Sequence, residues 1–222
     1  ISGTLMGKGL TILGSGSTFN ITSNTQIIQD GDVLVHDRVV VAEGTQASIT
    51  LTKADGVLSI LGPITIKSGA TLTLSANDIR LAGFDASDGT RHDAIVLEAG
   101  ATLVLGSAHL TVDSSITING GSDGRLVLQG QSLQGVVQDL NLSATDLVAL
   151  ANRLDNNSLA QLQIGNQAAK TTVRSPVLWD EGIDRIDLVG TLVTLGDTDQ
   201  AWRIGTDASF VATQSDLVLK AD

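Results

Sequence analysis

The chain has 222 residues, enough for one sizeable domain, and 42% of them are hydrophobic although only 2% are aromatic. It has no cysteine, which excludes disulfides, thiolate metal sites and cysteine catalysis, and no apolar run is long enough for a membrane-spanning helix. With 24 acidic and 13 basic residues, the net charge of −11 argues against nucleic-acid binding.

Short segments in which apolar and polar residues alternate run along most of the chain. This period of two is typical of strands that bury one face and expose Thr or Ser on the other. Gly, Asn, Asp and Ser separate the segments at short intervals, as turns require. The predicted strands include, in chain order, residues 10–12, 49–51, 58–60, 64–66, 72–74, 79–81, 110–112, 116–118, 126–128 and 162–164.

The segments are also self-similar, which indicates a repeat architecture. GATLTL at 69–74 recurs as GATLVL at 100–105, and Gly44, Gly56 and Gly69 stand 12 and 13 residues apart. Two such steps give a coil of roughly 20–25 residues. We therefore expect an all-β fold, a right-handed parallel β-helix (β-solenoid) with two or three strands per coil. Ten coils at most make a rod of about 45 Å.

One stretch departs from the strand pattern. Ser143 and Asp146 have the spacing of a helix-capping motif, and Leu147, Leu150, Ala151 and Leu154 then share one helical face. The sequence therefore predicts one short inserted α-helix near 143–155, packed against the rod by its leucines.

The chain opens at Ile1, inside an apolar stretch, without an initiator methionine or a leader. We expect residues 1–222 to form a single β-solenoid segment of a longer repetitive chain, whose export signal lies elsewhere.

Two blocks of sequence resemble a known family. The first consists of segments 56–60, 63–66 and 68–79, which resemble coils of filamentous-haemagglutinin-like exoproteins, long bacterial surface or secreted β-solenoids. The second block consists of segments 142–147, 162–165 and 177–180, which resemble a recurrent unit of giant members. The resemblance implies an extracellular or cell-surface stalk or adhesin, with an outer-membrane transporter and a cell-surface or glycan receptor as partners. It implies no catalytic residues.

The densest polar loop is a candidate calcium site. Asp85, Asp88 and Asp93 stand there among Ser and Thr hydroxyls, and Ca²⁺ prefers six to eight oxygen ligands. Their spacing differs from that of an EF-hand loop. The alternative is a solvated loop whose charge Arg91 partly neutralises. Calcium is the only cofactor that the sequence suggests.

Two other acidic groups allow different interpretations. Asp78, Asp85 and Asp88 with Arg80 and Arg91 could form a polysaccharide-cleaving site on one outer face. The few aromatic residues are scattered, which weakens this enzyme alternative. In the segment 180–187, Ile alternates with Asp, as in a strand with its charges outward.

The sequence thus predicts a mechanical function, a structural stalk or adhesin segment without catalytic residues. Flanking coils of the same chain, or copies stacked end to end, would cover the open ends. A self-assembling filament subunit is one alternative, and a polysaccharide-binding or -cleaving β-helix is another. Neither nucleic-acid binding nor membrane insertion is expected.

Overall fold

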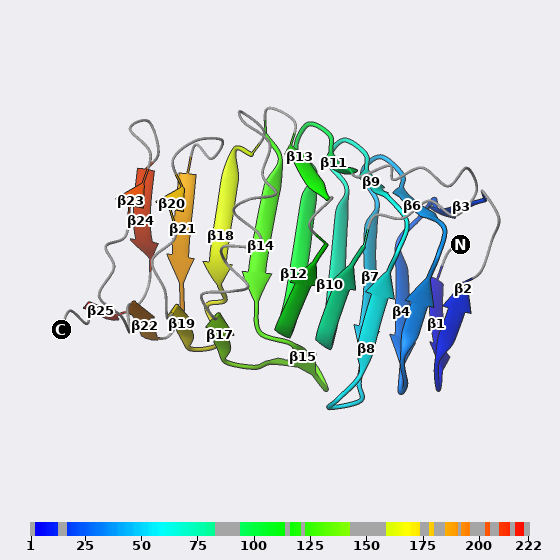
Figure 1. Ribbon diagram of the computed structural model, residues 1–222, viewed down its shortest axis with the longest axis horizontal. Coiled ribbons are helices and arrows are strands. Elements are labelled where there is room, and N and C mark those ends of the chain that lie inside the picture. The colour runs from blue at the N-terminus through cyan, green and yellow to red at the C-terminus, as the bar shows by residue number, and fades with distance from the viewer. Residues whose placement is uncertain are drawn as a thin grey trace.

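The computed structural model describes residues 3–12, 17–82, 94–113, 116–120, 123–142, 159–173, 178–179, 185–190, 192–195, 203–204, 209–213 and 216–219. Every regular element in these ranges is a β-strand. The strands wind into a parallel β-helix, as the sequence predicts, with successive coils stacked along the long axis (Figure 1).

The first face is a sheet that runs from one end of the rod to the other. Neighbouring strands in it pair in parallel, and each belongs to a different coil. Its strands are β1 (Gly3–Gly7), β4 (Thr25–Gln29), β7 (Gln46–Leu51), β10 (Thr71–Leu81), β12 (Thr102–Val112), β14 (Arg125–Gln129), β18 (Gln161–Gly165), β21 (Arg185–Val189) and β24 (Ser209–Thr213).

The second face follows after a corner in each coil. The long strands β10 and β12 pass through this corner, so that their second halves belong to it. Its other N-terminal strands are β2 (Leu10–Ile12), β5 (Val33–Val35) and β8 (Val57–Ile60). A separate parallel sheet consists of β17 (Leu140–Leu142), β19 (Thr171–Val173), β22 (Leu192–Leu195) and β25 (Asp216–Leu219).

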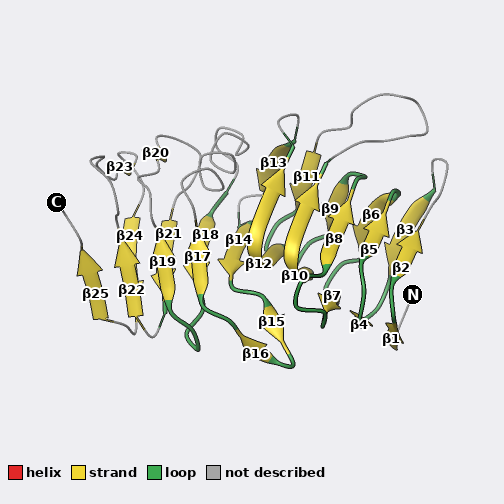
Figure 2. Cartoon of the chain, turned by 60° about the horizontal axis from the view of Figure 1, so that its bottom comes forward, coloured by secondary structure: helices red, strands yellow, loops and turns green. Residues whose placement is uncertain are grey.

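The third face is a five-stranded parallel sheet in the N-terminal half (Figure 2). Its strands are β3 (Thr18–Ile21), β6 (Arg38–Val41), β9 (Ile64–Ile66), β11 (Ala94–Leu97) and β13 (Thr117–Gly120). A further parallel pair consists of β20 (Leu178–Trp179) and β23 (Arg203–Ile204).

Coil length agrees with the predicted repeat. Register partners on neighbouring coils are 22 residues apart for Gly3 and Thr25, and 24 apart for Arg185 and Ser209. Two coils are longer, because Thr71 pairs with Thr102, 31 residues on, and Arg125 pairs with Gln161, 36 residues on. The extra residues lie in connections between faces, which leaves the strand register intact.

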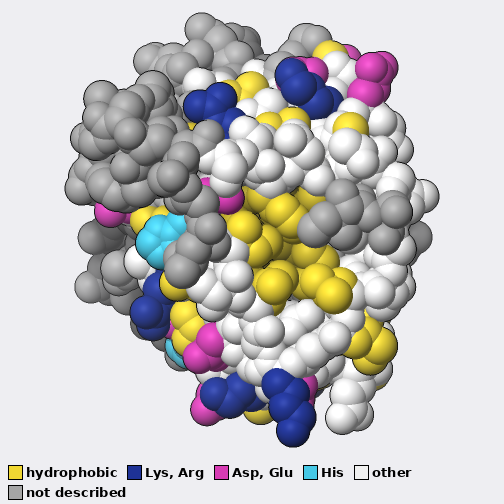
Figure 3. Space-filling model, turned by 90° about the vertical axis from the view of Figure 1, so that its right-hand side faces the viewer, with side chains coloured by type: hydrophobic (Ala, Val, Ile, Leu, Met, Phe, Trp, Pro, Cys, Tyr) yellow, Lys and Arg dark blue, Asp and Glu magenta, His cyan; other side chains and the backbone are white. Residues whose placement is uncertain are grey.

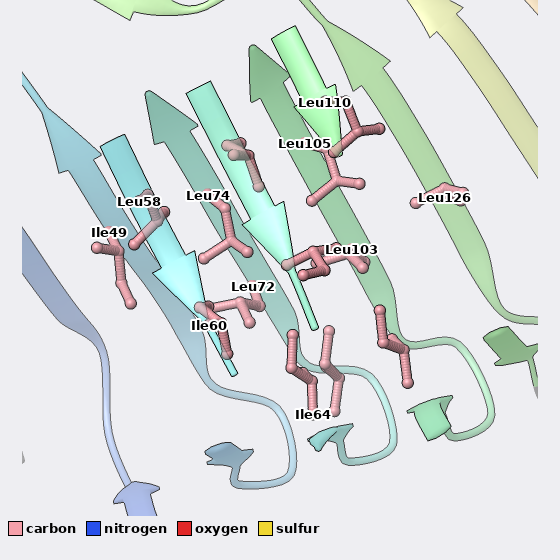
Figure 4. Packing of buried hydrophobic residues seen from close by; sticks show 14 of the residues in the cluster. Ile49, Leu58, Ile60, Ile64, Leu72, Leu74, Leu103, Leu105, Leu110 and Leu126 are labelled. Carbon is pink, nitrogen blue, oxygen red and sulfur yellow. The ribbon is translucent and has the colours of Figure 1, made fainter. Parts of the chain in front are cut away.

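The core consists of aliphatic rows that run parallel to the rod axis. Leu74 pairs with Ile49 on one side and Leu105 on the other, and all three side chains are buried. Figure 4 shows such residues from successive strands side by side inside the coil. Residues alternate along these stretches of strand, so Thr73 between Leu72 and Leu74, and Ser48 between Ala47 and Ile49, face outward. Each fully buried Leu or Ile contributes about 1.5–3 kcal/mol.

Stacked turns connect the third face to the first. In each, a backbone N–H donates to the carbonyl three residues earlier, as from Thr45 to Ala42 and from Ala70 to Lys67. The third turn residue is glycine with a left-handed φ, +64° at Gly44 and +65° at Gly69, a conformation that other residues adopt only with strain.

An antiparallel hairpin interrupts the parallel order. β15 (Ser132–Leu133) and β16 (Val136–Val137) form it where the other coils turn a corner. It extends back beneath the neighbouring coils (Figure 1), where Ser132 N donates to the buried Ser75 Oγ at 2.8 Å. The predicted helix near 143–155 lies outside the described residues, which resume at residue 159.

Candidate functional site

The predicted calcium loop connects β10 to β11. Asp85, Asp88 and Asp93 fall within residues 83–93, which lie outside the described part of the chain. The calcium hypothesis for these three residues therefore stays a prediction. Within the described ranges, no three His, Asp or Glu side chains lie together as metal ligands would.

Asp78 and Arg80, two residues of the proposed enzymatic cluster, form an ion pair. Arg80 Nη2 lies 2.7 Å from Asp78 Oδ2, on the outer surface of β10. The hydrogen bond to Asp78, and then its charge, raise the pKa of Arg80. The other residues of that cluster, Asp85, Asp88 and Arg91, lie outside the described ranges. In the described part of the chain, Asp78 is thus paired with a cation and not with a second carboxylate.

The acidic segment 180–187 enters β21 at Arg185. Asp187 pairs in register with Gln163, between the inward positions of Ile186 and Leu188. It is nevertheless only 6% exposed, and the Gln161 Nε2 amide donates to its carboxylate. The carboxylate of Asp187 is therefore on the outer side of the sheet, as the alternation predicts, but it is held by an amide and largely shielded from solvent.

A polar hollow lies on the first face, around Asp187. Its volume is about 390 Å³, and its walls come from three consecutive coils. The lining residues are Arg125, Gln163, Asn166, Gln167, Asp187 and Val189. The sequence interpretation missed this group because its members are spread over more than sixty residues. The available signal was the presence of Arg125, Gln163 and Asp187 at outward positions where the preceding coils have Thr102 or Val127.

Hydrogen bonds tie the walls of this hollow together. Arg125 donates to Gln163 Oε1, and Gln163 Nε2 donates to the Gly165 carbonyl at 2.9 Å. Asn166 Nδ2 donates to Gln129 Oε1 at 2.8 Å. The Nε of Arg125 is buried without a hydrogen-bond partner. Chemically, the hollow offers amide and guanidinium groups suited to hydroxyl or carboxylate oxygens.

A second candidate site is the N-terminal end of the rod, called here the end face, formed by β1 and β2. All side chains of β1 are exposed, including Leu5 at 40%. Leu10 and Ile12 of β2 are partly buried against the core. Viewed from this end, a patch of hydrophobic side chains lies at the centre of the face (Figure 3). The inward aliphatic rows of the described strands thus reach this end of the rod at β1 and β2.

In the described part of the chain, one ion pair joins two neighbouring coils at the stacked turns. Lys67 Nζ lies 2.5 Å from Glu98 Oε1 on the next coil, and Ser68 donates to the other carboxylate oxygen through N and Oγ. The hydrogen bond from Lys67 leads the causes that lower the pKa of Glu98. These contacts stabilise the stacking of two turns and do not form a pocket.

Comparison with family models, with curated proteins and with solved structures gives no match to this chain. Among the residues described, no helix has the length and hydrophobicity needed to cross a membrane.

Proposed function

We propose that this chain is a structural segment of a long filamentous protein on the bacterial surface or secreted from the cell, where it serves as a stiff stalk or adhesive spacer. The observation that carries the proposal is the first face, an unbroken ladder of parallel strands from β1 to β24. Load along the rod is shared between backbone hydrogen bonds and aliphatic rows that repeat in every coil. The family resemblance of segments 56–79 supports the extracellular location.

The outer surface also suits a spacer. Outward Thr, Ser and charged residues keep the faces hydrated, and the net charge of −11 opposes lateral association. The insertions that lengthen two coils leave the strand register unchanged, so the ladder of strands continues past them. A stalk needs no catalytic group, and none is assigned.

The stiffness can be measured directly, because the chain has no cysteine of its own. Cysteines introduced at the exposed Met6 and Lys170 can carry a fluorescent donor and acceptor on the first and seventh coils. Six coil steps give an axial separation of about 29 Å. Single-molecule energy transfer should yield one narrow distribution that broadens only in denaturant. A broad distribution in native buffer contradicts the stiff spacer.

The polar hollow supports a second candidate, a polysaccharide-binding surface. Guanidinium and amide groups from two coils and the Asp187 carboxylate from a third converge there, and such groups bind sugar hydroxyls. Titration with neutral and acidic oligosaccharides should show saturable binding that Arg125→Ala weakens and that Lys170→Ala, at an exposed residue outside the hollow, leaves unchanged. Equal binding by both variants contradicts this candidate, and cleavage of the sugar would identify an enzyme instead.

Calcium binding by the loop between β10 and β11 is part of this proposal. If Asp85, Asp88 and Asp93 hold Ca²⁺, the thermal midpoint should rise when Ca²⁺ is added and fall back with a chelator, as for any ligand that binds the folded state. Mg²⁺ at equal concentration is the control. An unchanged midpoint contradicts the calcium loop and leaves the stalk proposal standing.

A further inference from the structure

The polar hollow contains one cationic and one anionic side chain, on the two strands that flank its centre. Arg125 comes from β14 and Asp187 from β21, and β18 runs between these strands (Figure 1). Two strand spacings of about 4.8 Å each separate β14 from β21. The register places Gln161 beside Arg125, and Gln163 beside Asp187. The two charged groups therefore stand on opposite sides of these glutamines.

Hydrogen bonds hold both charged groups in position. Arg125 donates to Gln163 Oε1, and Gln161 Nε2 donates to the Asp187 carboxylate. Gln163 is fixed in turn, because its Nε2 donates to the Gly165 carbonyl at 2.9 Å. A ligand thus meets groups that are already oriented, so less side-chain entropy is lost when it binds.

Both charged groups have capacity for further hydrogen bonds. A guanidinium has five N–H donors, and the buried Nε of Arg125 has no partner. A carboxylate accepts about four hydrogen bonds, and the amide of Gln161 supplies one of those that Asp187 accepts. The hollow therefore offers donors on its β14 side and acceptors on its β21 side.

This combination suits a ligand whose groups both donate and accept. A sugar hydroxyl does both, so one hydroxyl accepts from Arg125 while another donates to Asp187. The carboxylate of an acidic sugar accepts from Arg125 but has no proton to donate, and Asp187 repels it. The net charge of −11 adds to this repulsion. The two charges in the hollow thus favour a neutral sugar over an acidic one.

The size and the apolar part of the hollow fit the same ligand. Its volume of about 390 Å³ falls within the range of about 300–1,000 Å³ for small-molecule sites. Val189 supplies an apolar wall for the C–H groups of a sugar ring. Among the lining residues that the structure describes, none is aromatic. Hydrogen bonds, and not ring stacking, therefore decide which sugar is bound.

We propose that the polar hollow binds a neutral sugar unit of a polysaccharide and that Asp187 excludes acidic sugars from it. The inference rests on the polysaccharide-binding candidate proposed above and names the class of sugar that this surface takes. Arg125 is the group that binds, since it donates to ligand oxygens of either class. Asp187 is the group that selects, because it accepts from hydroxyls and repels carboxylates.

Isothermal titration calorimetry of the whole chain with matched trisaccharides tests this selectivity. Each pair consists of a neutral trisaccharide of glucose, galactose or mannose and its counterpart oxidised to a carboxylate at C6. The wild type should bind at least one neutral member saturably, and its acidic counterpart about tenfold more weakly. The methyl ester of that acidic trisaccharide, which keeps the size but loses the charge, should regain most of the affinity.

Three variants assign the two roles. Asp187→Asn keeps an oxygen for the Gln161 amide but removes the charge, so the preference for the neutral member should fall to about threefold or less. Glu43→Gln is the matched control, because it removes one negative charge at an exposed residue outside the hollow, and it should keep the wild-type preference. Arg125→Ala should weaken binding of the neutral member about tenfold.

Failure of the selectivity is distinguishable from failure of sugar binding. Three outcomes overturn the selectivity: equal or tighter binding of the acidic member, a methyl ester as weak as the acid, or the same preference in Asp187→Asn as in Glu43→Gln. The polysaccharide-binding candidate then stands if Arg125→Ala still weakens binding. No binding of any trisaccharide overturns both. If circular dichroism shows that Asp187→Asn does not fold, the methyl ester decides the selectivity in the wild-type chain.

Discussion

At the scale of single residues, contacts between coils are made at fixed positions of the repeat. Glu98 accepts hydrogen bonds from Lys67 and Ser68 of the preceding coil. Its side chain is 33% exposed and that of Lys67 is 43% exposed, so solvent screens the pair and its contribution is about 1 kcal/mol at most. Charge pairs here adjust the stacking that the aliphatic rows provide.

The pair of Lys67 and Glu98 predicts how the free energy of unfolding depends on pH. Folding lowers the pKa of Glu98 below its ordinary value of about 4.3. The ionised carboxylate therefore stabilises the folded chain at neutral pH, and this stabilisation is lost as the pH falls through the lowered pKa. Glu98→Gln should therefore reduce the free energy of unfolding at pH 7 by up to about 1 kcal/mol, and the difference should shrink toward zero near about pH 3.

Urea denaturation at both pH values measures the difference. The control is Glu43→Gln, because Glu43 lies in the equivalent turn of an earlier coil and is exposed. A pH-independent effect of Glu98→Gln, or the same effect at Glu43, contradicts the assignment.

At the scale of elements, the hairpin of β15 and β16 is the largest departure from the repeat. It follows β14 and reaches back to an earlier coil, where Ser132 N donates to Ser75 Oγ. Ser75 is 1% exposed, so without the hairpin its hydroxyl loses a buried partner. The Gly130 backbone lies against the carbonyl of Gln138, which places the two ends of the hairpin next to each other.

Excision of residues 131–138, which joins Gly130 to Asp139, should therefore fold and lose about 1–3 kcal/mol of stability. Thermal melting measures the loss, and hydrogen exchange should quicken at Ser75 and its neighbours. Val136→Ala at the exposed tip should change stability by less than about 0.5 kcal/mol. If the excised chain melts as the wild type does, the hairpin is not a strap between coils.

At the scale of the whole molecule, the strands of each coil pair only with those of neighbouring coils in the described part of the chain, so stability depends on position along the rod. Leu74 and Leu5 occupy the same inward row, but Leu74 is 0% exposed in the interior and Leu5 is 40% exposed at the end. The same substitution therefore removes very different amounts of packing at the two sites.

Leu74→Ala should cost about 2–5 kcal/mol, whereas Leu5→Ala should cost less than about 1 kcal/mol. Chemical denaturation of the two variants measures the contrast. Thr73→Ala, on the same strand as Leu74 but facing outward, is the control for strand propensity. Similar losses at Leu74 and Leu5 would indicate a compact core and not a stack.

The strands could be predicted from the sequence because each one shows its own alternation of apolar and polar residues. Residues 64–66 form β9, and residues 72–74 and 79–81 lie within β10, since a period of two is a property of each segment alone. The repeat of GATLTL and GATLVL also shows in the sequence, and the structure pairs these segments directly, Leu72 with Leu103 and Leu74 with Leu105. Local periodicity and repetition therefore sufficed for the strands and the parallel β-helix.

The polar hollow was decided by tertiary structure. Arg125, Gln163 and Asp187 become neighbours only because coils of unequal length keep one register, and the length of an insertion is not a periodic signal. The hairpin was missed for the same reason, since it replaces a corner without disturbing the alternation around it. A pattern of period two fixes which face of a strand is buried, while the winding of the chain decides which distant strands lie side by side.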